Sequence, residues 1–180
     1  TVAEVAEGVT EYSVGDRVAL FPSATCGRCK NCMKGRESLC VSSKVYGMVR
    51  DGALAQYVTA PIWSVVKIPD GVSFNEAAII TDGVSTPFHA LRSRGDLKAG
   101  ESVAVVGCGG LGTHAILLAK MMGAGFIVAI DTQKAARDRA LELGADLAID
   151  PMGEVEPRKV IRQHLGDGVL SQNARGHVLG

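Results

Sequence analysis

The stretch Val105–Gly112, VVGCGGLG, decides the fold prediction because it places closely spaced glycines between an apolar run and a helical run. Gly107, Gly109 and Gly112 follow the pattern G-x-G-x-x-G, with Gly110 as an additional glycine. In this pattern the first glycine permits a tight turn and the second lets a pyrophosphate approach the backbone. The third lets the helix pack closely on the strand, and the N–H groups at the helix start face the anion.

The segments around this loop alternate between two periodicities. Apolar runs at 102–107, 126–131 and 147–150 are typical of buried strands, and 112–124 and 133–144 are typical of helices. This alternation predicts a parallel sheet covered on both faces. Asp131 ends the second strand, about 20 residues past the loop, where a carboxylate accepts ribose hydroxyls. The predicted dinucleotide-binding residues are therefore Gly107, Gly109, Gly110, Leu111, Gly112 and Asp131.

Each feature has a plainer interpretation when it is taken alone. The glycines could form a simple strand–helix turn, and Asp131 could be a helix N-cap. Asp131 would repel a 2′-phosphate, which favours NAD over NADP as the cofactor. Lys134 and Arg137 weaken that preference, although they could equally lie on a solvated helix face. Cys108, within the loop, is interpreted as a small buried side chain.

Residues 1–69 have a different composition, which is rich in valine. Short alternating runs such as DRVALF (16–21), AQYVTA (55–60) and WSVVKIP (63–69) are separated by glycine, aspartate and proline turns, which predicts a compact all-β unit. The opening residues 1–21 alternate like a strand pair around a turn. A chain that opens within β structure is interpreted as a fragment. Helical patterns begin near Asn75 and continue after Asp82.

Four of the five cysteines lie in CGRCKNCMKGRESLC, Cys26–Cys40, with the spacing C-x2-C-x2-C-x7-C. A redox CxxC would need only two of them, and a ferredoxin-type cluster normally has a shorter last gap followed by proline. The spacing favours a tetrahedral Zn2+ held by Cys26, Cys29, Cys32 and Cys40. Nearby basic residues would offset the negative charge of the thiolates. Four protein thiolates leave no open position, so this zinc is predicted to be structural and not catalytic.

The motifs occur in a characteristic order: GDRV (15–18), the four cysteines, IPDGVSFNEAA (68–78) and VVGCGGLG. Over about residues 1–150 the chain resembles the zinc-containing medium-chain alcohol dehydrogenase superfamily. The resemblance implies an α/β protein with part of a GroES-like β domain (1–93), whose structural zinc lobe spans 26–40. A partial Rossmann NAD-binding domain (94–180), a doubly wound parallel sheet, would follow. It also implies hydride transfer between an alcohol and NAD at a cleft between the domains.

The resemblance further implies a second, catalytic zinc in the intact enzyme, bound by a Cys, by the His of Gly-His-Glu and by a third ligand. That third position falls in TDGVSTPFHAL (81–91), which makes Asp82 the predicted ligand. Its alternative role is a helix N-cap. Thr86, by resemblance, would face the nicotinamide, or else it is a packed helical threonine. His89 lies about 10.5 Å further along a continuous helix, too far to share an ion with Asp82.

The catalytic set is incomplete in this chain. It contains no Gly-His-Glu, and the other two ligands would precede Thr1, so the chain alone is expected to be inactive. His89, His114, His164 and His177 are interpreted as packing or surface residues. After LAIDP (147–151), EPRKVIRQHLGDG (156–168) predicts a helix. The remainder is too short and polar for the sheet that the family would add, although ARGHVLG (174–180) resembles a later family strand.

Composition limits the expected partners. A formal net charge of zero in 180 residues gives no indication of nucleic acid or an acidic membrane surface, and the apolar runs are too short to span a bilayer. Without a secretory signal, clustered cysteines favour metal or redox roles over a disulfide framework, and a cytoplasmic location is expected. The expected partner is a small-molecule alcohol, with a homo-oligomer for the intact enzyme. The alternatives are a polyol, sugar or acyl-CoA alcohol dehydrogenase, or a non-catalytic zinc- and nucleotide-binding module.

Overall fold

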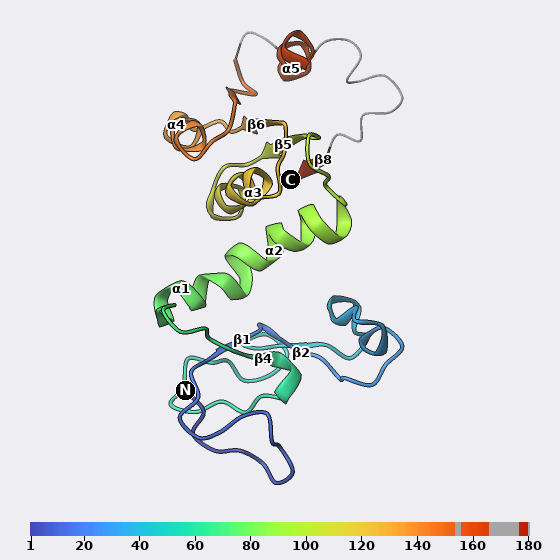
Figure 1. The fold of residues 1–180 in the computed structure, drawn as a ribbon, viewed down its shortest axis with the longest axis vertical. Helices are drawn as coiled ribbons and strands as arrows, with labels where there is room; N and C mark the ends of the chain where they lie inside the picture. Colours follow the sequence, from blue (N-terminus) through green and yellow to red (C-terminus); the bar gives the residue numbers. More distant parts are fainter. Residues whose placement is uncertain (154–155, 166–176, 180) are drawn as a thin grey trace. The chain divides into compact units, whose positions relative to one another are not determined.

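A computed structural model describes residues 1–153, 156–165 and 177–179 of the chain. The chain forms two compact units, Thr1–Asp82 and Gly83–Gly180 (Figure 1). The sequence analysis placed the boundary between the GroES-like domain and the Rossmann domain at residues 93–94, and this boundary stays a prediction. None of the helices in the described residues is long and apolar enough to cross a membrane.

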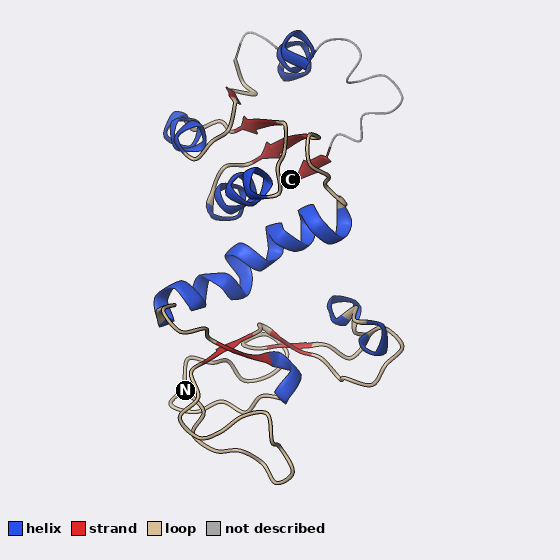
Figure 2. Ribbon diagram, viewed as in Figure 1, coloured by secondary structure: helices blue, strands red, loops and turns tan. Residues whose placement is uncertain are grey.

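The first unit is built on two small antiparallel ladders (Figure 2). Strand β1 (Val18–Leu20) pairs with β4 (Val65–Lys67), with Val18 opposite Lys67. Strand β2 (Ser23–Ala24) pairs with β3 (Lys44–Val45). The 3-10 helices η1 (Cys32–Lys34) and η2 (Glu37–Leu39) lie in the loop between β2 and β3, and η3 (Ile62–Ser64) precedes β4. The cysteine loop is therefore held at its base by a two-residue ladder.

The predicted strands of this unit are only partly present. The runs DRVALF and WSVVKIP contain β1 and β4, as predicted, but the strand pair expected over residues 1–21 is wrong, because only Val18–Leu20 is a strand there. AQYVTA (55–60) forms no strand either. Alternation makes a strand only where a neighbouring backbone supplies a ladder. Residues 1–17 make two backbone hydrogen bonds across their turn, from Val2 N to Asp16 O and from Gly15 N to Val2 O, both 2.9 Å long.

A helical segment begins at Ser73, the N-cap of α1 (Phe74–Ile79). Ser73 and Glu76 form a reciprocal capping box: the Ser73 Oγ accepts the Glu76 N–H at 3.2 Å, and the Glu76 carboxylate accepts the Ser73 N–H at 2.7 Å. The helical assignment continues without a break through the π-helical η4 (Ile80–Val84), α2 (Ser85–Phe88) and the π-helical η5 (His89–Arg94). Pro87 lacks an N–H for the regular pattern, and wider turns lie on either side of it.

The second unit is a parallel sheet in the order β7-β6-β5-β8, of which Figure 1 labels β6, β5 and β8. Its strands are β5 (Ser102–Val106), β6 (Phe126–Ile130), β7 (Leu147–Ile149) and β8 (His177–Leu179), and its helices are α3 (Gly110–Met121), α4 (Lys134–Glu142) and α5 (Pro157–Leu165). The predicted alternation of strands and helices from 102 to 150 is confirmed, although α3 begins earlier, at Gly110. The core consists of aliphatic side chains of β5 and β6 packed against the buried face of α3.

The C-terminal expectations have mixed outcomes. The predicted helix is present as α5. The run ARGHVLG contains β8, which pairs in parallel with β5, with His177 opposite Val103. The run VLSQN (169–173) lies outside the described residues.

Candidate functional site

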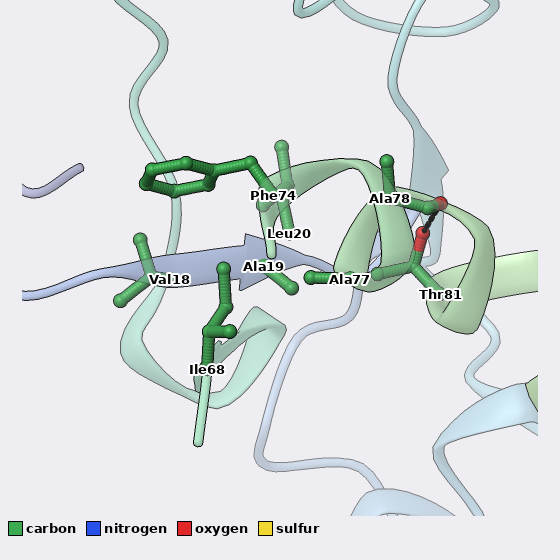
Figure 3. Close-up of a pocket in the computed structure, with 8 residues that line it drawn as sticks. All are labelled: Val18, Ala19, Leu20, Ile68, Phe74, Ala77, Ala78 and Thr81. Carbon is green, nitrogen blue, oxygen red and sulfur yellow. Dashed lines mark hydrogen bonds between the residues drawn. The ribbon is translucent and has the colours of Figure 1, made fainter. Parts of the chain in front are cut away.

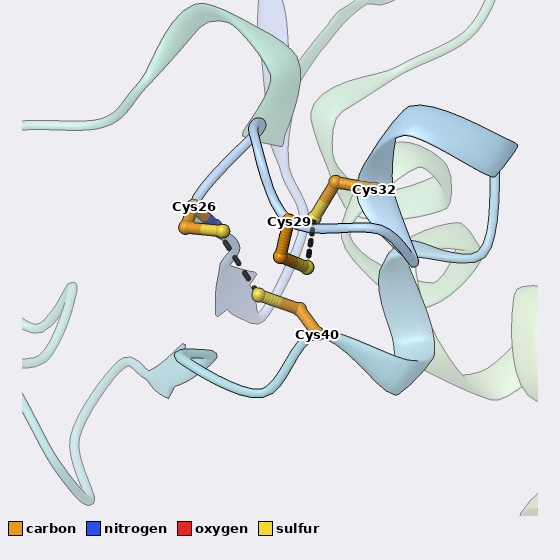
Figure 4. Close-up of side chains that lie close together, drawn as sticks. All are labelled: Cys26, Cys29, Cys32 and Cys40. Atoms are coloured by element: carbon orange, nitrogen blue, oxygen red, sulfur yellow. Dashed lines mark hydrogen bonds between the residues drawn. The ribbon is translucent and has the colours of Figure 1, made fainter.

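The four clustered cysteines converge in space (Figure 4). Their sulfur atoms all lie within 4.8 Å of one another, and each cysteine is a free thiol. A tetrahedral zinc with Zn–S bonds of about 2.3 Å holds its sulfurs roughly 3.8 Å apart. The cluster therefore fits Zn2+ after a small contraction, and it contains no disulfide.

Packing around the first cysteine pair determines the shape of this loop. Gly27 has φ +68°, and a Cβ added there would lie 3.0 Å from the ring of Trp63. The indole N–H of Trp63 donates to the carbonyl of Thr25 at 2.9 Å, which fixes the ring next to Cys26. The side-chain amide of Asn31 donates to the carbonyl of Leu39 and links η1 to η2. These contacts bring the last cysteine back to the first three.

Backbone N–H groups directed at sulfur make the cluster suitable for thiolates. Hydrogen bonds from the N–H groups of Arg28 and Cys29 lower the pKa of Cys26. The N–H of Cys32 is the main cause of the lowered pKa of Cys29, about 6. Burial among the other thiols raises the pKa of Cys32 to about 11. A divalent cation would supply the charge that this buried sulfur lacks.

The glycine loop follows β5 as predicted, and its glycines have different structural causes. Gly107 has φ +85°, which favours glycine, and a Cβ on Gly112 would lie 1.8 Å from the carbonyl oxygen of Gly107. In contrast, a Cβ added to Gly109 or Gly110 would meet nothing within 4 Å. The fold itself requires Gly107 and Gly112. It leaves Gly109 and Gly110 bordering open space at the start of α3, and the neighbouring Leu111 is also exposed.

Asp131 directly follows β6 and connects it to the glycine loop. Its Oδ2 accepts the N–H of Cys108 at 2.7 Å, and its Oδ1 accepts the N–H of Gln133 at 2.8 Å. These two bonds, first that from Gln133, lower the pKa of Asp131. The N-cap of α4 is Gln133, so the capping alternative for Asp131 is not supported. Sequence reasoning missed this bracing role; a carboxylate oxygen still has a second lone pair for another donor.

The two cations that the sequence placed close after Asp131, Lys134 and Arg137, are paired with carboxylates, while Arg139, whose charge also lowers the pKa of Asp131, donates to a backbone carbonyl. Lys134 forms an exposed ion pair with Asp138 at 2.7 Å. Arg137 is more enclosed: its Nη1 lies 3.0 Å from Asp150 Oδ2 and donates to the carbonyls of Asp131, at 2.8 Å, and Thr132, at 2.9 Å. Lys134 therefore lies on a solvated helix face, as the alternative interpretation had it, whereas Arg137 does not. No sequence motif indicated the Arg137–Asp150 pair, because it depends on how β6 and β7 align.

Cys108 is a core residue, as predicted. Only 1% of its surface is exposed, and it packs in the hydrophobic core of the sheet unit. Burial is the main cause of its raised pKa, and the nearby Asp131 adds to it. Arg139 donates to the Cys108 carbonyl at 3.0 Å. The loop cysteine is therefore part of the packing and not of the metal cluster.

The predicted catalytic residues do not gather into a second metal centre. Asp82 lies in η4 and Thr86 in α2, and both are exposed. Among the described residues, the four-cysteine cluster is the one group that could hold a metal ion. The helical segment is capped by Ser73, so N-capping does not account for Asp82, and its ligand role stays a prediction. The described residues do not supply a complete ligand set for a catalytic zinc.

The histidines of the described helices lie at or near the surface. His89 in η5 and His164 in α5 are exposed, whereas His114 in α3 is half-buried. The Nδ1 atoms of His114 and His164 each lie within 3 Å of the carbonyl four residues earlier, at 2.8 Å and 2.9 Å. This agrees with their predicted packing or surface role.

A small apolar pocket of about 280 Å³ lies in the first unit (Figure 3). Residues of β1 and α1 line it, together with Ile68 and Thr81. The Thr81 hydroxyl donates to the carbonyl of Ala78 at 3.2 Å. With no titratable group in its lining, the pocket offers binding volume but no acid–base chemistry.

Comparison with known proteins agrees with this arrangement. Residues 1–70 match the family described as the alcohol dehydrogenase GroES-like domain, and residues 110–170 match the family described as zinc-binding dehydrogenase. An alcohol dehydrogenase of Geobacillus stearothermophilus is 43% identical over 151 residues, which covers 83% of this chain and 44% of that protein. Sorbitol dehydrogenase of Bacillus subtilis is 38% identical over 176 residues, covering 96% of this chain and 49% of that protein.

A solved structure shares the fold. The alcohol dehydrogenase TADH from Thermus sp. ATN1 superposes with a TM-score of 0.85 at 31% identity, covering 92% of this chain and 49% of that chain. The present chain thus spans about half the length of the relatives it matches. Both families match in the order that the motifs indicated.

Proposed function

Because the chain belongs to the zinc-containing medium-chain alcohol dehydrogenase superfamily, we propose that it is part of an NAD-dependent alcohol dehydrogenase. The whole protein would oxidise an alcohol to an aldehyde or ketone by hydride transfer to NAD. The observation that carries this proposal is the open space at Gly109 and Gly110, at a helix start braced by Asp131. The fold needs no glycine at either position, whereas the close approach of a pyrophosphate needs one at Gly109.

The proposed cofactor contacts use groups of the second unit. Backbone N–H groups at the start of α3 would bind the pyrophosphate, and the second lone pairs of the Asp131 carboxylate would accept ribose hydroxyls. NAD is favoured over NADP because Asp131 repels a 2′-phosphate while Lys134 and Arg137 already have carboxylate partners. The cofactor itself supplies hydride transfer, and these residues hold and orient its adenosine half.

The proposed zinc role is structural. Cys26, Cys29, Cys32 and Cys40 would hold one Zn2+ that closes the loop between β2 and β3. Asp82 is proposed as one ligand of the catalytic zinc of the whole enzyme, and Thr86 as a residue that faces the nicotinamide. The described residues do not complete that second site, so we expect the chain alone to form no NADH when it is incubated with NAD, zinc and simple alcohols.

The direct test is fluorescence titration of the purified chain with NADH. We expect saturable binding of one NADH per chain. ADP-ribose, which contains the adenosine and the pyrophosphate, should displace it. Nicotinamide mononucleotide should not, because the glycine loop and Asp131 are proposed to contact the pyrophosphate and the adenosine half. The absence of saturable NADH binding would overturn the proposal.

Two alternatives remain in view. Similarity to sorbitol dehydrogenase of Bacillus subtilis supports a polyol as the substrate of the whole enzyme, and comparing turnover of sorbitol and ethanol by that enzyme separates the two. A non-catalytic zinc- and nucleotide-binding module would bind NADH without turnover even in the whole protein.

We further propose a cytoplasmic location, which suits the free thiols, and a homo-oligomeric intact enzyme.

A further inference from the structure

We propose that the Arg137–Asp150 ion pair sets the preference of the nucleotide site for NAD over NADP, by withholding Arg137 from the position of a 2′-phosphate. The proposal rests on the proposed function, since it assumes that the adenosine ribose lies at Asp131. It assigns a specificity role to Asp150, which neither the glycine loop nor the carboxylate at the end of β6 suggests. Asp150 would act through Arg137 and is a positioning residue.

Arg137 contacts the residue that carries the proposed ribose contact. Its Nη1 donates to the backbone carbonyl of Asp131, at 2.8 Å, while the carboxylate of the same residue is proposed to accept the ribose hydroxyls. Asp150 follows the neighbouring strand β7, and its Oδ2 lies 3.0 Å from the same Nη1. The guanidinium of Arg137 is thus engaged by Asp150 and by the backbone carbonyls of Asp131 and Thr132.

The carboxylate of Asp150 is itself held in place. Its Oδ1 accepts the N–H of Met152 at 2.9 Å, which leaves Oδ2 for Arg137. Only 18% of the Arg137 side chain is exposed, so solvent screens this pair less than a surface pair. Arginine is well suited to bind phosphate because its planar guanidinium can donate two parallel hydrogen bonds. A released Arg137 therefore offers the phosphate ligand that NADP needs.

Lys134 and Asp138 provide a matched comparison on the same helix. Their ion pair has side chains that are 79% and 52% exposed. Such a pair contributes little and is already open to competing ligands. Neutralising Asp138 removes the same charge from α4 as neutralising Asp150 removes from the end of β7, but it does not release Arg137.

The test compares the dissociation constants of NADH and NADPH, which differ only by the 2′-phosphate. Asp150→Asn keeps an oxygen for the Met152 N–H and removes the charge that holds Arg137. We expect NADPH to bind about tenfold more tightly to this variant, with NADH changed by no more than about twofold. The double variant Asp150→Asn/Arg137→Gln should lose the gain, and Asp138→Asn should show none. A purely structural role for the pair would weaken both nucleotides and improve neither.

Three results would overturn the proposal: an unchanged NADH-to-NADPH preference in Asp150→Asn, an equal gain in Asp138→Asn, or a gain that survives in the double variant. Thermal unfolding establishes that each variant is folded, and Asp150→Ser provides a second neutral replacement if the asparagine variant is not. A wild-type chain that binds neither nucleotide refutes the proposed function, and this proposal with it. Wild-type binding of NADH with no shift in Asp150→Asn refutes this proposal alone.

Discussion

Replacing Gly112 by alanine should destabilise the sheet unit, because the added Cβ clashes with the backbone of the glycine loop. The added Cβ would lie 1.8 Å from the carbonyl oxygen of Gly107 and 2.9 Å from its carbonyl carbon, whereas ordinary van der Waals contact begins at 3.4 Å. Both obstacles are backbone atoms, so no side chain can rotate away. Helix α3 would have to move off β5 by more than about 1 Å, against a close-packed core.

The cost follows from known overpacking effects. Forcing extra atoms into a packed interior costs about 1–3 kcal/mol when side chains can adjust, and more when the backbone must move. We therefore expect a loss of about 3 kcal/mol or more in the free energy of unfolding. For a unit of about 100 residues this lowers Tm by roughly 12 °C or more.

Gly109→Ala is the matched control, because its Cβ meets nothing within 4 Å. Its Tm should stay within about 2 °C of the wild-type value, while NADH binding weakens about tenfold because the methyl group occupies the approach of the pyrophosphate. Circular dichroism melts and NADH titrations of the two variants make the comparison. A Gly112→Ala chain that melts like wild type would refute the argument from packing, and tight NADH binding by Gly109→Ala would refute the argument from open space.

Three further predictions concern the metal and the carboxylate. Cys40→Ser should reduce bound zinc, measured by mass spectrometry of the metal, to a small fraction of one per chain, whereas Cys108→Ala should keep it; equal losses would contradict the assignment. Chelating the zinc should shift the emission of Trp63, the one tryptophan, because its ring packs against the first cysteine turn; unchanged emission would argue against that coupling. The lowered pKa of Asp131 means that its ionised form stabilises the fold above the unfolded pKa of about 3.9, and that this stability is lost as pH falls through the lower folded value. In Asp131→Asn the free energy of unfolding should therefore fall less steeply as the pH is lowered below about 4. An equally steep fall would show that other carboxylates cause the acid sensitivity.

Local patterns predicted the sheet unit well. The run from β5 through the glycine loop to α3 is determined by residues close in sequence, and the structure adds a packing or backbone reason for Gly107 and Gly112. The four cysteines were also predictable as a cluster, since short spacings bring sulfurs together without help from distant segments. In both cases the proposed binding role follows from the spacing of residues that are close together in the sequence.

Contacts between distant segments were not predictable in the same way. Residues 1–17 alternate like strands, yet no ladder forms there, because alternation does not specify a partner. The bond from Cys108 N–H to Asp131 and the pair of Arg137 with Asp150 depend on the alignment of neighbouring strands. The π-helical turn at Asp82 precedes Pro87, but a proline alone does not specify how wide the neighbouring turn is.

The central claim is that the cysteine cluster is a closed structural site, so that any chemistry of the whole enzyme takes place elsewhere. X-ray absorption at the zinc edge of the purified chain tests it most directly. The account predicts one zinc per chain surrounded by four sulfurs at about 2.3 Å. A bound oxygen or nitrogen in place of one sulfur would mean an open position, and would contradict the claim.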